Sequence, residues 1–567
     1  MKTKIRVILV MLILVGISCE HKILDITPQD RISDAAVWND EILIKAYLSS
    51  LYNAIPHGFY IHMYSKYTDE AYNSTSCCCA ELFVLNTYSP DNIASMGGIT
   101  LEENWCTNFL YYWDVGYHFL RKVNVFLEKM AETEFEFEGK DQLIAEAHFI
   151  RAFIYFELIK RFGGVPIVDQ AYYLGDDIEF ERNTFDECVA FIEQDLNEAI
   201  TSLPDRYTST DANYGRATAD AAQGLLSRTL LYAASPLHNP SNDLQKWQNA
   251  ADAAEALLDK GYSLYPDYQG LFILSHGDAQ DEVIFSRGFT ATETGGHQAP
   301  MHNFNRRYEA YGGWWVSNGP TQNLVDDYDM INGEPAFLED GTINPASGYD
   351  PQNPFLNRDP RFEATILHDG VVFREDTFEM WIAEDGSQWG YDSYKNTGDN
   401  PRTNYVLKKF MPTDGDFNWQ TYYSIQWPYI RLAEIYLNYA EAMYELGDEA
   451  TAREYVSMVR ARAGLPALPE SLTGDDLKRR IYNERRIELA FENQRMFDVR
   501  RWKIAIDIEN RPIRTLDIYL DLNTGVKRYH EVVLLDKSGT YEEHMNLLPI
   551  AADEIQRNPA LTQTPGW

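Results

Sequence analysis

Basic residues and long apolar runs are scarce in this sequence. Its 567 residues include 49 lysines and arginines against 86 aspartates and glutamates, which gives a formal net charge of −37 at pH 7. A charge of this sign repels phosphate, so nucleic acid is excluded as a partner class. After residue 18 no apolar run reaches the roughly 18 residues of a membrane-spanning helix, so we expect no transmembrane segment in the mature chain.

The motifs of several enzyme classes are also missing. The sequence has no Gly-x-Ser-x-Gly nucleophile elbow, no His-Glu-x-x-His metal motif and no Gly-x-x-x-x-Gly-Lys phosphate loop. Carboxylates are so abundant that some pair will lie at glycosidase spacing by chance, and nothing marks one pair out. The sequence therefore predicts that the protein is not an enzyme.

Cysteine is rare, and its spacing does not match a metal site. Zinc sites use spaced pairs of ligands, whereas three of these cysteines are consecutive and no second pair follows. We therefore expect no cofactor and no metal at the cysteines, and the pattern leaves their disulfide state open. Calcium binding at a cluster of aspartates is a less favoured alternative. The cysteines are Cys19, Cys77, Cys78, Cys79, Cys106 and Cys188, and the aspartates are Asp326, Asp327 and Asp329.

The first residues have the pattern of an export signal. Three basic residues precede an uncharged run at 7–18, which is too short to span a bilayer and suits the apolar core of a signal peptide. Small residues then lead directly to Cys19, as in the lipobox of bacterial lipoproteins. We predict a signal peptide at 1–18 and lipidation of Cys19, and the alternative is an ordinary signal peptide with an incidental cysteine.

Much of the chain has helical periodicity. Between Gln142 and Phe162 two apolar stripes recur at helical spacing, so this helix is expected to be covered on two sides, as in a stack of helical pairs. Residues 431–464 have the length and small-residue positions of a tetratricopeptide-like hairpin, with Gly447 and Asp448 at the turn. Further helices are expected at 183–203, 217–235, 245–260 and 475–493.

These elements predict an all-α dominated fold, a tetratricopeptide-like solenoid of helical pairs with a loop-rich insertion. The helical scaffold is expected at about 36–262 and 429–510. Glycine, proline, asparagine and aromatic residues replace the periodic pattern at about 263–428, which is too long for an ordinary connection and marks the insertion. Residues 511–567 are expected to form a C-terminal tail.

The order and spacing of several motifs resemble the SusD/RagB family of outer-membrane nutrient-binding lipoproteins, from residue 19 to residue 567. The motifs include Leu-Asp-Ile-Thr-Pro-Gln at 24–29, Glu-Ala-His-Phe-Ile-Arg-Ala at 146–152, Gly-Arg-Ala-Thr at 215–218, Arg-Asp-Pro-Arg at 358–361 and Phe-Asp-Val-Arg-Arg-Trp at 497–502. The resemblance implies one domain over 19–567.

What this family implies is a lipid-anchored protein on the cell surface of the outer membrane. It would bind an oligosaccharide and deliver it to a TonB-dependent (SusC-like) transporter, without acting as an enzyme. The alternatives are a peptide-binding uptake subunit of the same type, a structural surface protein, or a helical-toroid glycan hydrolase or lyase.

The first candidate ligand site is an aromatic segment in the insertion, where glycines beside two tryptophans let the chain expose them. Aromatic faces suit sugar rings because they cover CH groups and leave the hydroxyls to polar partners. The competing interpretation is that the tryptophans attach the insertion to the helices. The candidates are Arg306, Tyr308, Tyr311, Trp314 and Trp315.

Two earlier segments supply further candidates. Trp105 and Asn108 precede an early helix, on a loop that the resemblance places against the ligand, although Trp105 also fits the apolar stripe of that helix. Tyr67 and Asp69 belong to another early loop, where Asp69 could accept a hydrogen bond from a sugar hydroxyl. For these two, a solvated loop without ligand contact is the favoured alternative.

One segment reverses the charge of the chain. Residues 478–503 contain nine basic and four acidic residues, a local charge of +5. A basic patch could meet an acidic partner, but glutamates share the same helix and arginine pairs well with carboxylates. We therefore expect an internal ion-pair network that holds the last helices together.

Overall fold

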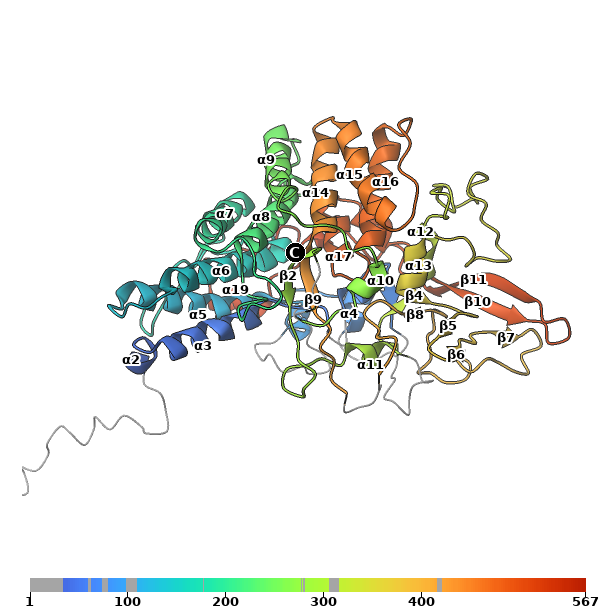
Figure 1. Ribbon diagram of the computed structural model, residues 1–567, viewed down its shortest axis with the longest axis horizontal. Coiled ribbons are helices and arrows are strands. Elements are labelled where there is room, and N and C mark those ends of the chain that lie inside the picture. Colours follow the sequence, from blue (N-terminus) through green and yellow to red (C-terminus); the bar gives the residue numbers. More distant parts are fainter. Residues whose placement is uncertain are drawn as a thin grey trace, which may run out of the picture.

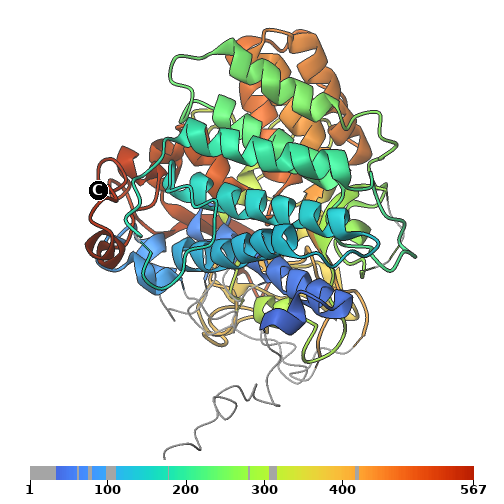
Figure 2. The same ribbon diagram turned by 90° about the vertical axis from the view of Figure 1, so that its left-hand side faces the viewer.

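The computed structural model describes residues 34–59, 63–73, 80–97, 110–176, 178–276, 278, 281–304, 316–415 and 421–567. Helices dominate it and stack in rows, from blue at the bottom through teal to green and orange at the top of Figure 2. The longer ones are α3 (Glu41–Leu51), α5 (Trp113–Glu132), α6 (Lys140–Phe162), α7 (Phe185–Ser202), α8 (Ala219–Ala234), α9 (Leu244–Glu255), α14 (Leu432–Glu445), α15 (Glu449–Arg462) and α16 (Gly474–Glu488).

Each helix packs on the next, which confirms the predicted solenoid of helical pairs. The neighbours in the stack are α5 and α6, α6 and α7, α7 and α8, α8 and α9, and α14 and α15. The stack also continues from α9 directly to α14, although the insertion separates them in sequence (Figure 1). No helix in the described part of the chain is long and apolar enough to cross a membrane.

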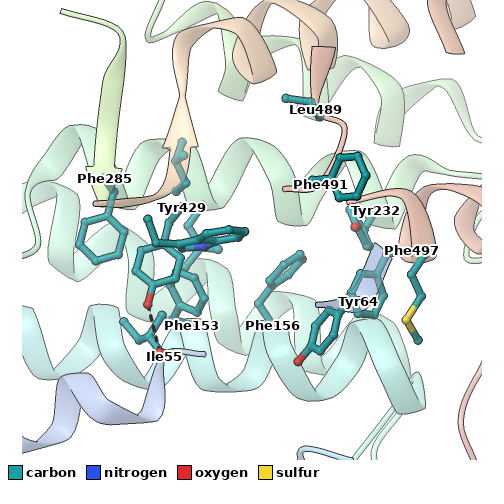
Figure 3. Close-up of a cluster of buried hydrophobic side chains, with 14 of the residues drawn as sticks. Ile55, Tyr64, Phe153, Phe156, Tyr232, Phe285, Tyr429, Leu489, Phe491 and Phe497 are labelled. Carbon is teal, nitrogen blue, oxygen red and sulfur yellow. Dashed lines mark hydrogen bonds between the residues drawn. The ribbon is translucent and has the colours of Figure 1, made fainter. Parts of the chain in front are cut away.

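The two stripes of α6 explain its place in the middle of the stack. Phe153 and Phe156 of this helix are 1% and 0% exposed. Their rings meet aromatic rings of other elements, with centroids 5.6 Å apart for Phe153 and Tyr429 and 5.2 Å for Phe156 and Tyr232 (Figure 3). On the other stripe Ile154 is 0% exposed, and α6 packs on both α5 and α7, so the prediction of two buried sides is confirmed.

The hairpin predicted at 431–464 is α14 and α15. Gly447 at the turn has φ of +89°, a value that glycine adopts without strain. Asp448 caps α15, because its carboxylate accepts a hydrogen bond from Thr451 N at 3.0 Å. Ala440 and Ala452 are completely buried where the two helices pack. The last predicted helix, 475–493, ends earlier, at Glu488.

The described residues of the insertion at 263–428 form only short elements, as expected. Its first and last strands, β2 and β9, pair antiparallel at the centre of the molecule, so the insertion starts and ends in the core. The elements are α10 (Tyr268–Leu271), β2 (Val283–Arg287), α11 (Ala299–Asn303), β3 (Gly319–Pro320), α12 (Gln322–Asp327), α13 (Pro360–Thr365), β4 (Ile366–Leu367), β5 (Val372–Phe373), β6 (Asp376–Thr377), β7 (Ile382–Ala383), β8 (Val406–Leu407) and β9 (Trp427–Arg431).

The C-terminal residues 511–567 contain more structure than the word tail suggests. The strands β10 (Ile513–Leu520) and β11 (Lys527–Leu535) form an antiparallel hairpin, and β10 also pairs in parallel with β7 of the insertion. In Figure 1 this hairpin projects from the end of the molecule opposite α2 (Asp34–Val37). The remaining short elements are η2 (Tyr52–Ala54), η3 (Tyr64–Tyr67), β1 (Ala71–Tyr72), α4 (Ala80–Val84), η4 (Ile93–Met96), α17 (Arg495–Arg501), α18 (Ala505–Glu509), η6 (Glu543–Asn546) and α19 (Ala552–Arg557).

The positive segment at 478–503 takes part in a buried ion-pair network, as predicted. Arg431 pairs with Glu488 at 2.6 Å and with Glu492 at 2.7 Å, and Arg361 pairs with Glu488 at 3.0 Å. Burial opposes ionisation of Glu488, but Arg462, Arg431 and Arg361 hold its pKa well below the usual value. The network therefore joins the insertion to the last helices of the stack.

Arginines also neutralise the aspartates considered for calcium. Asp326 pairs with Arg514, Asp327 pairs with Arg486 at 3.0 Å, and Asp329 pairs with Arg460 at 2.8 Å. No cluster of three or more His, Cys, Asp or Glu side chains with metal-binding geometry occurs among the described residues.

Candidate ligand-binding site

Most of the side chains predicted to contact ligand lie outside the described residues, and so does Cys19. Only Tyr67 and Asp69 fall within the described part of the chain. The residues outside it are Arg306, Tyr308, Tyr311, Trp314, Trp315, Trp105 and Asn108.

The described residues that flank each of these two segments are hydrogen-bonded to each other. Phe304 and Val316, on either side of 305–315, are joined by a backbone hydrogen bond of 3.4 Å. Met96 and Tyr111, near the two ends of 98–109, are joined in the same way at 3.1 Å. Each of the two segments therefore leaves and re-enters the scaffold at one point.

The same flanking residues lie beside the early loop. Asn318 accepts a hydrogen bond from Met63 N at 3.2 Å and donates one to Asn303 at 2.8 Å. Arg161 of α6 donates to Leu110 O and to the hydroxyl of Tyr64, both at 2.8 Å. The structure thus brings the attachment points of all three predicted segments to one place. We call it the anchoring patch, and its residues are Met63, Tyr64, Leu110, Arg161, Asn303 and Asn318.

Tyr67 and Asp69 lie inside this patch and not on a solvated loop. Each is 2% exposed. The ring of Tyr67 meets that of Phe83 edge-on at 5.2 Å, and Asp69 pairs with Arg486 and with Arg495, the latter at 2.9 Å. Burial works against the charge of Asp69, but the two arginines hold its pKa well below the usual value. Its oxygens are therefore occupied by donors from the protein.

The neighbouring Glu70 has the opposite character. It is 1% exposed, and its Oε1 atom has no hydrogen-bond partner among the residues that the structure describes. Burial raises the pKa of Glu70 to about 8, against the opposing effect of Arg486 and Arg495. Burial thus favours the protonated form of the Glu70 carboxyl, next to Asp69 in the chain.

An open cleft of about 690 Å³ lies beside the patch. One wall is β2 with the loop that follows it, and the other walls come from η2 and the turn before α8. Figure 3 shows three residues of its floor, Phe285, Tyr429 and Ile55, where the hydroxyl of Tyr429 donates to Ile55 O at 3.0 Å. The rings of Phe285 and Tyr429 stack with centroids 5.2 Å apart, so packed aromatic rings form this part of the floor.

His276 forms part of the rim and fits there because two neighbours are glycines. A Cβ atom on Gly288 would lie 2.3 Å from the imidazole, and one on Gly215 would lie 2.7 Å from it. The ring of Tyr214 packs on the same imidazole with centroids 5.0 Å apart. The two glycines therefore place an aromatic pair at the mouth of the cleft.

A ring contact and a short helix connect the cleft wall to the anchoring patch. His297 in the cleft wall stacks on Phe59 with centroids 4.0 Å apart and planes 15° apart. Helix α11 then leads from this wall to Asn303 in the patch.

The sequence patterns did not mark Arg287, Tyr214 or His276 as site residues. The sequence feature that pointed toward the cleft was the Gly-Arg-Ala-Thr motif at 215–218, because its first two residues line the cleft.

The fold is that of a helical-repeat protein whose irregular segments line an open cleft. Residues 281–567 match the model of the SusD family, and residues 24–231 match a model described as starch-binding associating with outer membrane. The chain therefore belongs to the SusD family.

Similar proteins come from Bacteroides. A SusD-like protein of Bacteroides ovatus is 25% identical over 522 residues, covering 88% of this chain and 83% of the relative. The crystal structure of a SusD-like protein from Bacteroides fragilis has a TM-score of 0.75 at 29% identity, covering 95% of this chain and all of that one. A SusD-like carbohydrate-binding protein from the same species has a TM-score of 0.72 at 25% identity, covering 93% of this chain and all of that one.

Proposed function

We propose that this protein captures oligosaccharides at the cell surface and delivers them to a TonB-dependent transporter of the outer membrane. The observation that carries the proposal is the convergence of the attachment points of three predicted ligand-contacting segments on one patch, next to an open cleft. A rigid scaffold that presents irregular segments at one place is suited to binding.

The comparisons support the same function. One matching family model is described by starch binding and outer-membrane association, and one similar structure is that of a carbohydrate-binding protein. Lipidation of Cys19 would hold the protein at the membrane, and several acyl chains would make that attachment stable.

Affinity electrophoresis in gels loaded with polysaccharide tests the binding. Retardation by at least one glycan is expected, and at least one of Trp314→Ala, Trp315→Ala and Trp105→Ala should weaken it, because each change removes an aromatic face. The matched control is Trp389→Ala, which removes a tryptophan that is 44% exposed near β7. If the three variants migrate like the parent protein, the aromatic site is wrong. If peptides bind and no glycan does, the protein is a peptide carrier.

Two further measurements test the role in uptake. A reducing-sugar assay on each bound glycan should show no release of product, and turnover would contradict a binding-only protein. Purification from outer membranes should recover a TonB-dependent transporter with the protein. The Cys19→Ser variant should leave the membrane fraction, and its retention there would contradict the lipid anchor.

A further inference from the structure

The cleft beside the anchoring patch has an unusual charge for this protein. Aspartate and glutamate make up 86 of the 567 residues, but none of the described residues that line the cleft is acidic. Two arginines line it, Arg216 and Arg287. Glu293 belongs to the loop after β2 but is not among the lining residues. A positive cleft in a protein of charge −37 concentrates anions at that place.

The two arginines have different surroundings. Arg216 is neutralised, because it pairs with the buried Glu146 at 2.8 Å, and Glu146 also accepts a hydrogen bond from Tyr52 at 2.6 Å. Arg287 makes no ion pair within the described part of the chain. Its Nη2 donates to the amide oxygen of Asn53 at 3.4 Å, and its guanidinium lies over the ring of Phe289 at 5.4 Å.

Arg287 is therefore positioned by neutral groups and keeps its charge available. Phe289 supports one face of the guanidinium, and Asn53 is a weak neutral acceptor at its edge. The planar fork of arginine binds carboxylate and sulfate oxygens in pairs. Among the described residues of the cleft wall, no acidic side chain competes for it.

A smaller groove of about 280 Å³ extends the cleft and shares Tyr214, Arg216 and Phe285 with it. Its far side contains Arg206, which lies over the ring of Tyr262 at 5.1 Å. Among the described residues that line this groove, Asp281 is the single carboxylate. Cleft and groove together form a path with a guanidinium near each end.

We propose that this path binds an acidic oligosaccharide, with the carboxylate or sulfate of one sugar unit on Arg287 and the chain extending toward Arg206. This inference rests on the proposed function and names its substrate class. A sugar suits the path better than a peptide because the lining offers hydroxyl and amide groups together with an aromatic pair at the rim. The hydroxyl and amide side chains of the cleft include Asn53, Ser286, Thr290 and Thr294.

The histidines of the cleft do not add to its charge at neutral pH. Burial lowers the pKa of His297 to about 3. Burial, with a smaller contribution from Arg287, holds the pKa of His57 well below its usual value. Burial also lowers the pKa of His276 at the rim. The positive charge of the cleft therefore comes from arginine.

The test compares charged and neutral glycans by affinity electrophoresis and calorimetry. The charged probes are polygalacturonate, which offers carboxylates, and carrageenan, which offers sulfates, and the neutral probes are galactan and laminarin. The full chain is expected to bind at least one charged probe more tightly than either neutral one. A difference between the two charged probes tells carboxylate from sulfate recognition.

Arg287→Gln should weaken binding of the charged probe by about tenfold or more, since a hydrogen bond to a charged group is lost. Binding of a neutral glycan should change less than about twofold, because a neutral glycan has no charged group that loses its hydrogen bond to Arg287. Arg287→Lys should lie between the two, because it keeps the charge but loses the fork. The matched control is Arg557→Gln on α19, where the side chain is 70% exposed. Circular dichroism verifies that each variant is folded.

Each remaining outcome is decisive. Preference for neutral probes, or an equal loss in Arg287→Gln and Arg557→Gln, overturns the inference and leaves the proposed function standing. Binding of an acidic peptide such as polyglutamate, with no acidic glycan bound, also overturns it. A protein that binds no glycan of either kind refutes the proposed function itself.

Discussion

Replacing Arg431 by methionine tests how strongly the buried ion pairs hold the insertion to the helical stack. Arg431 is 1% exposed and pairs with Glu282 at 2.7 Å, with Glu488 at 2.6 Å and with Glu492 at 2.7 Å. Methionine keeps much of the side-chain volume and removes the charge. The three buried carboxylates of Glu282, Glu488 and Glu492 then each lose their ion pair with Arg431.

Removing one partner of a buried pair costs about 3–5 kcal/mol of folding free energy, because an uncompensated charge is left behind. Glu488 keeps Arg361 and Arg462, and Glu492 keeps Lys409. We therefore expect the lower end of that range, about 3 kcal/mol at pH 7.5. The assay is urea unfolding followed by far-UV circular dichroism.

The loss should also depend on pH. In the parent protein burial opposes ionisation, but the surrounding cations hold the pKa of Glu488 and Glu492 below the value of 4.5 for a free glutamate. Such groups stabilise the fold above that value, and the contribution disappears as pH falls through the folded pKa. Without Arg431 their pKa rises and protonation relieves the buried charge, so the difference between variant and parent should shrink from pH 7.5 to pH 5.

Arg479→Met is the matched control. Its side chain is 50% exposed and pairs with Glu339 and Asp476, and exposed pairs contribute at most about 1 kcal/mol. A loss below about 1 kcal/mol for Arg431→Met would refute the reasoning. The reasoning would also fail if the exposed control lost as much stability as the buried variant, or if the loss did not change with pH.

Three more predictions follow from single contacts. Gly288→Ala should weaken glycan binding severalfold with the fold retained, because the new Cβ would displace His276 from the rim of the cleft. Calorimetry measures the affinity, and an unchanged affinity would exclude a role for that rim. The pKa of Glu70 is raised to about 8 by burial, so its contribution to the free energy of unfolding is present below pH 4.5 and is lost as pH rises toward 8. The melting temperature of Glu70→Gln should therefore rise relative to that of the parent protein between pH 4.5 and pH 8. A difference in melting temperature that stays constant over this interval would contradict the prediction. Phe153→Ala should cost about 3–5 kcal/mol in urea unfolding, since the ring is 1% exposed, and a cost below about 1 kcal/mol would show that the core re-forms around the gap.

The sequence determined the helical stack. The stripes of α6 and the small residues of the 431–464 hairpin recur at helical spacing, which is a local property of the sequence, so this spacing was sufficient to predict a helix with two buried sides and a helical hairpin. The ion-pair network could also be expected, because the nine basic residues at 478–503 belong to a chain of net charge −37, which offers many carboxylates as ion-pair partners.

Two predicted boundaries needed the tertiary structure. Helix α16 was expected to reach 493, but it ends at Glu488, and the turn that follows holds Phe491 and Asn493 at φ of +62° and +61°. Residues 511–567 were expected to be a tail, but they form the β10–β11 hairpin. Its third strand, β7, comes from the insertion more than a hundred residues earlier, so the local pattern did not reveal the pairing.

The candidate site divides in the same way. Periodicity and motifs located the segments that carry the tryptophans, but only the folded chain placed their attachment points on one patch. Only the folded chain also placed Arg287, Tyr214 and His276 around one cleft. The lack of acidic side chains among the described residues of the cleft cannot be read from composition, because which of 86 carboxylates lies near a given arginine depends on contacts between distant parts of the chain.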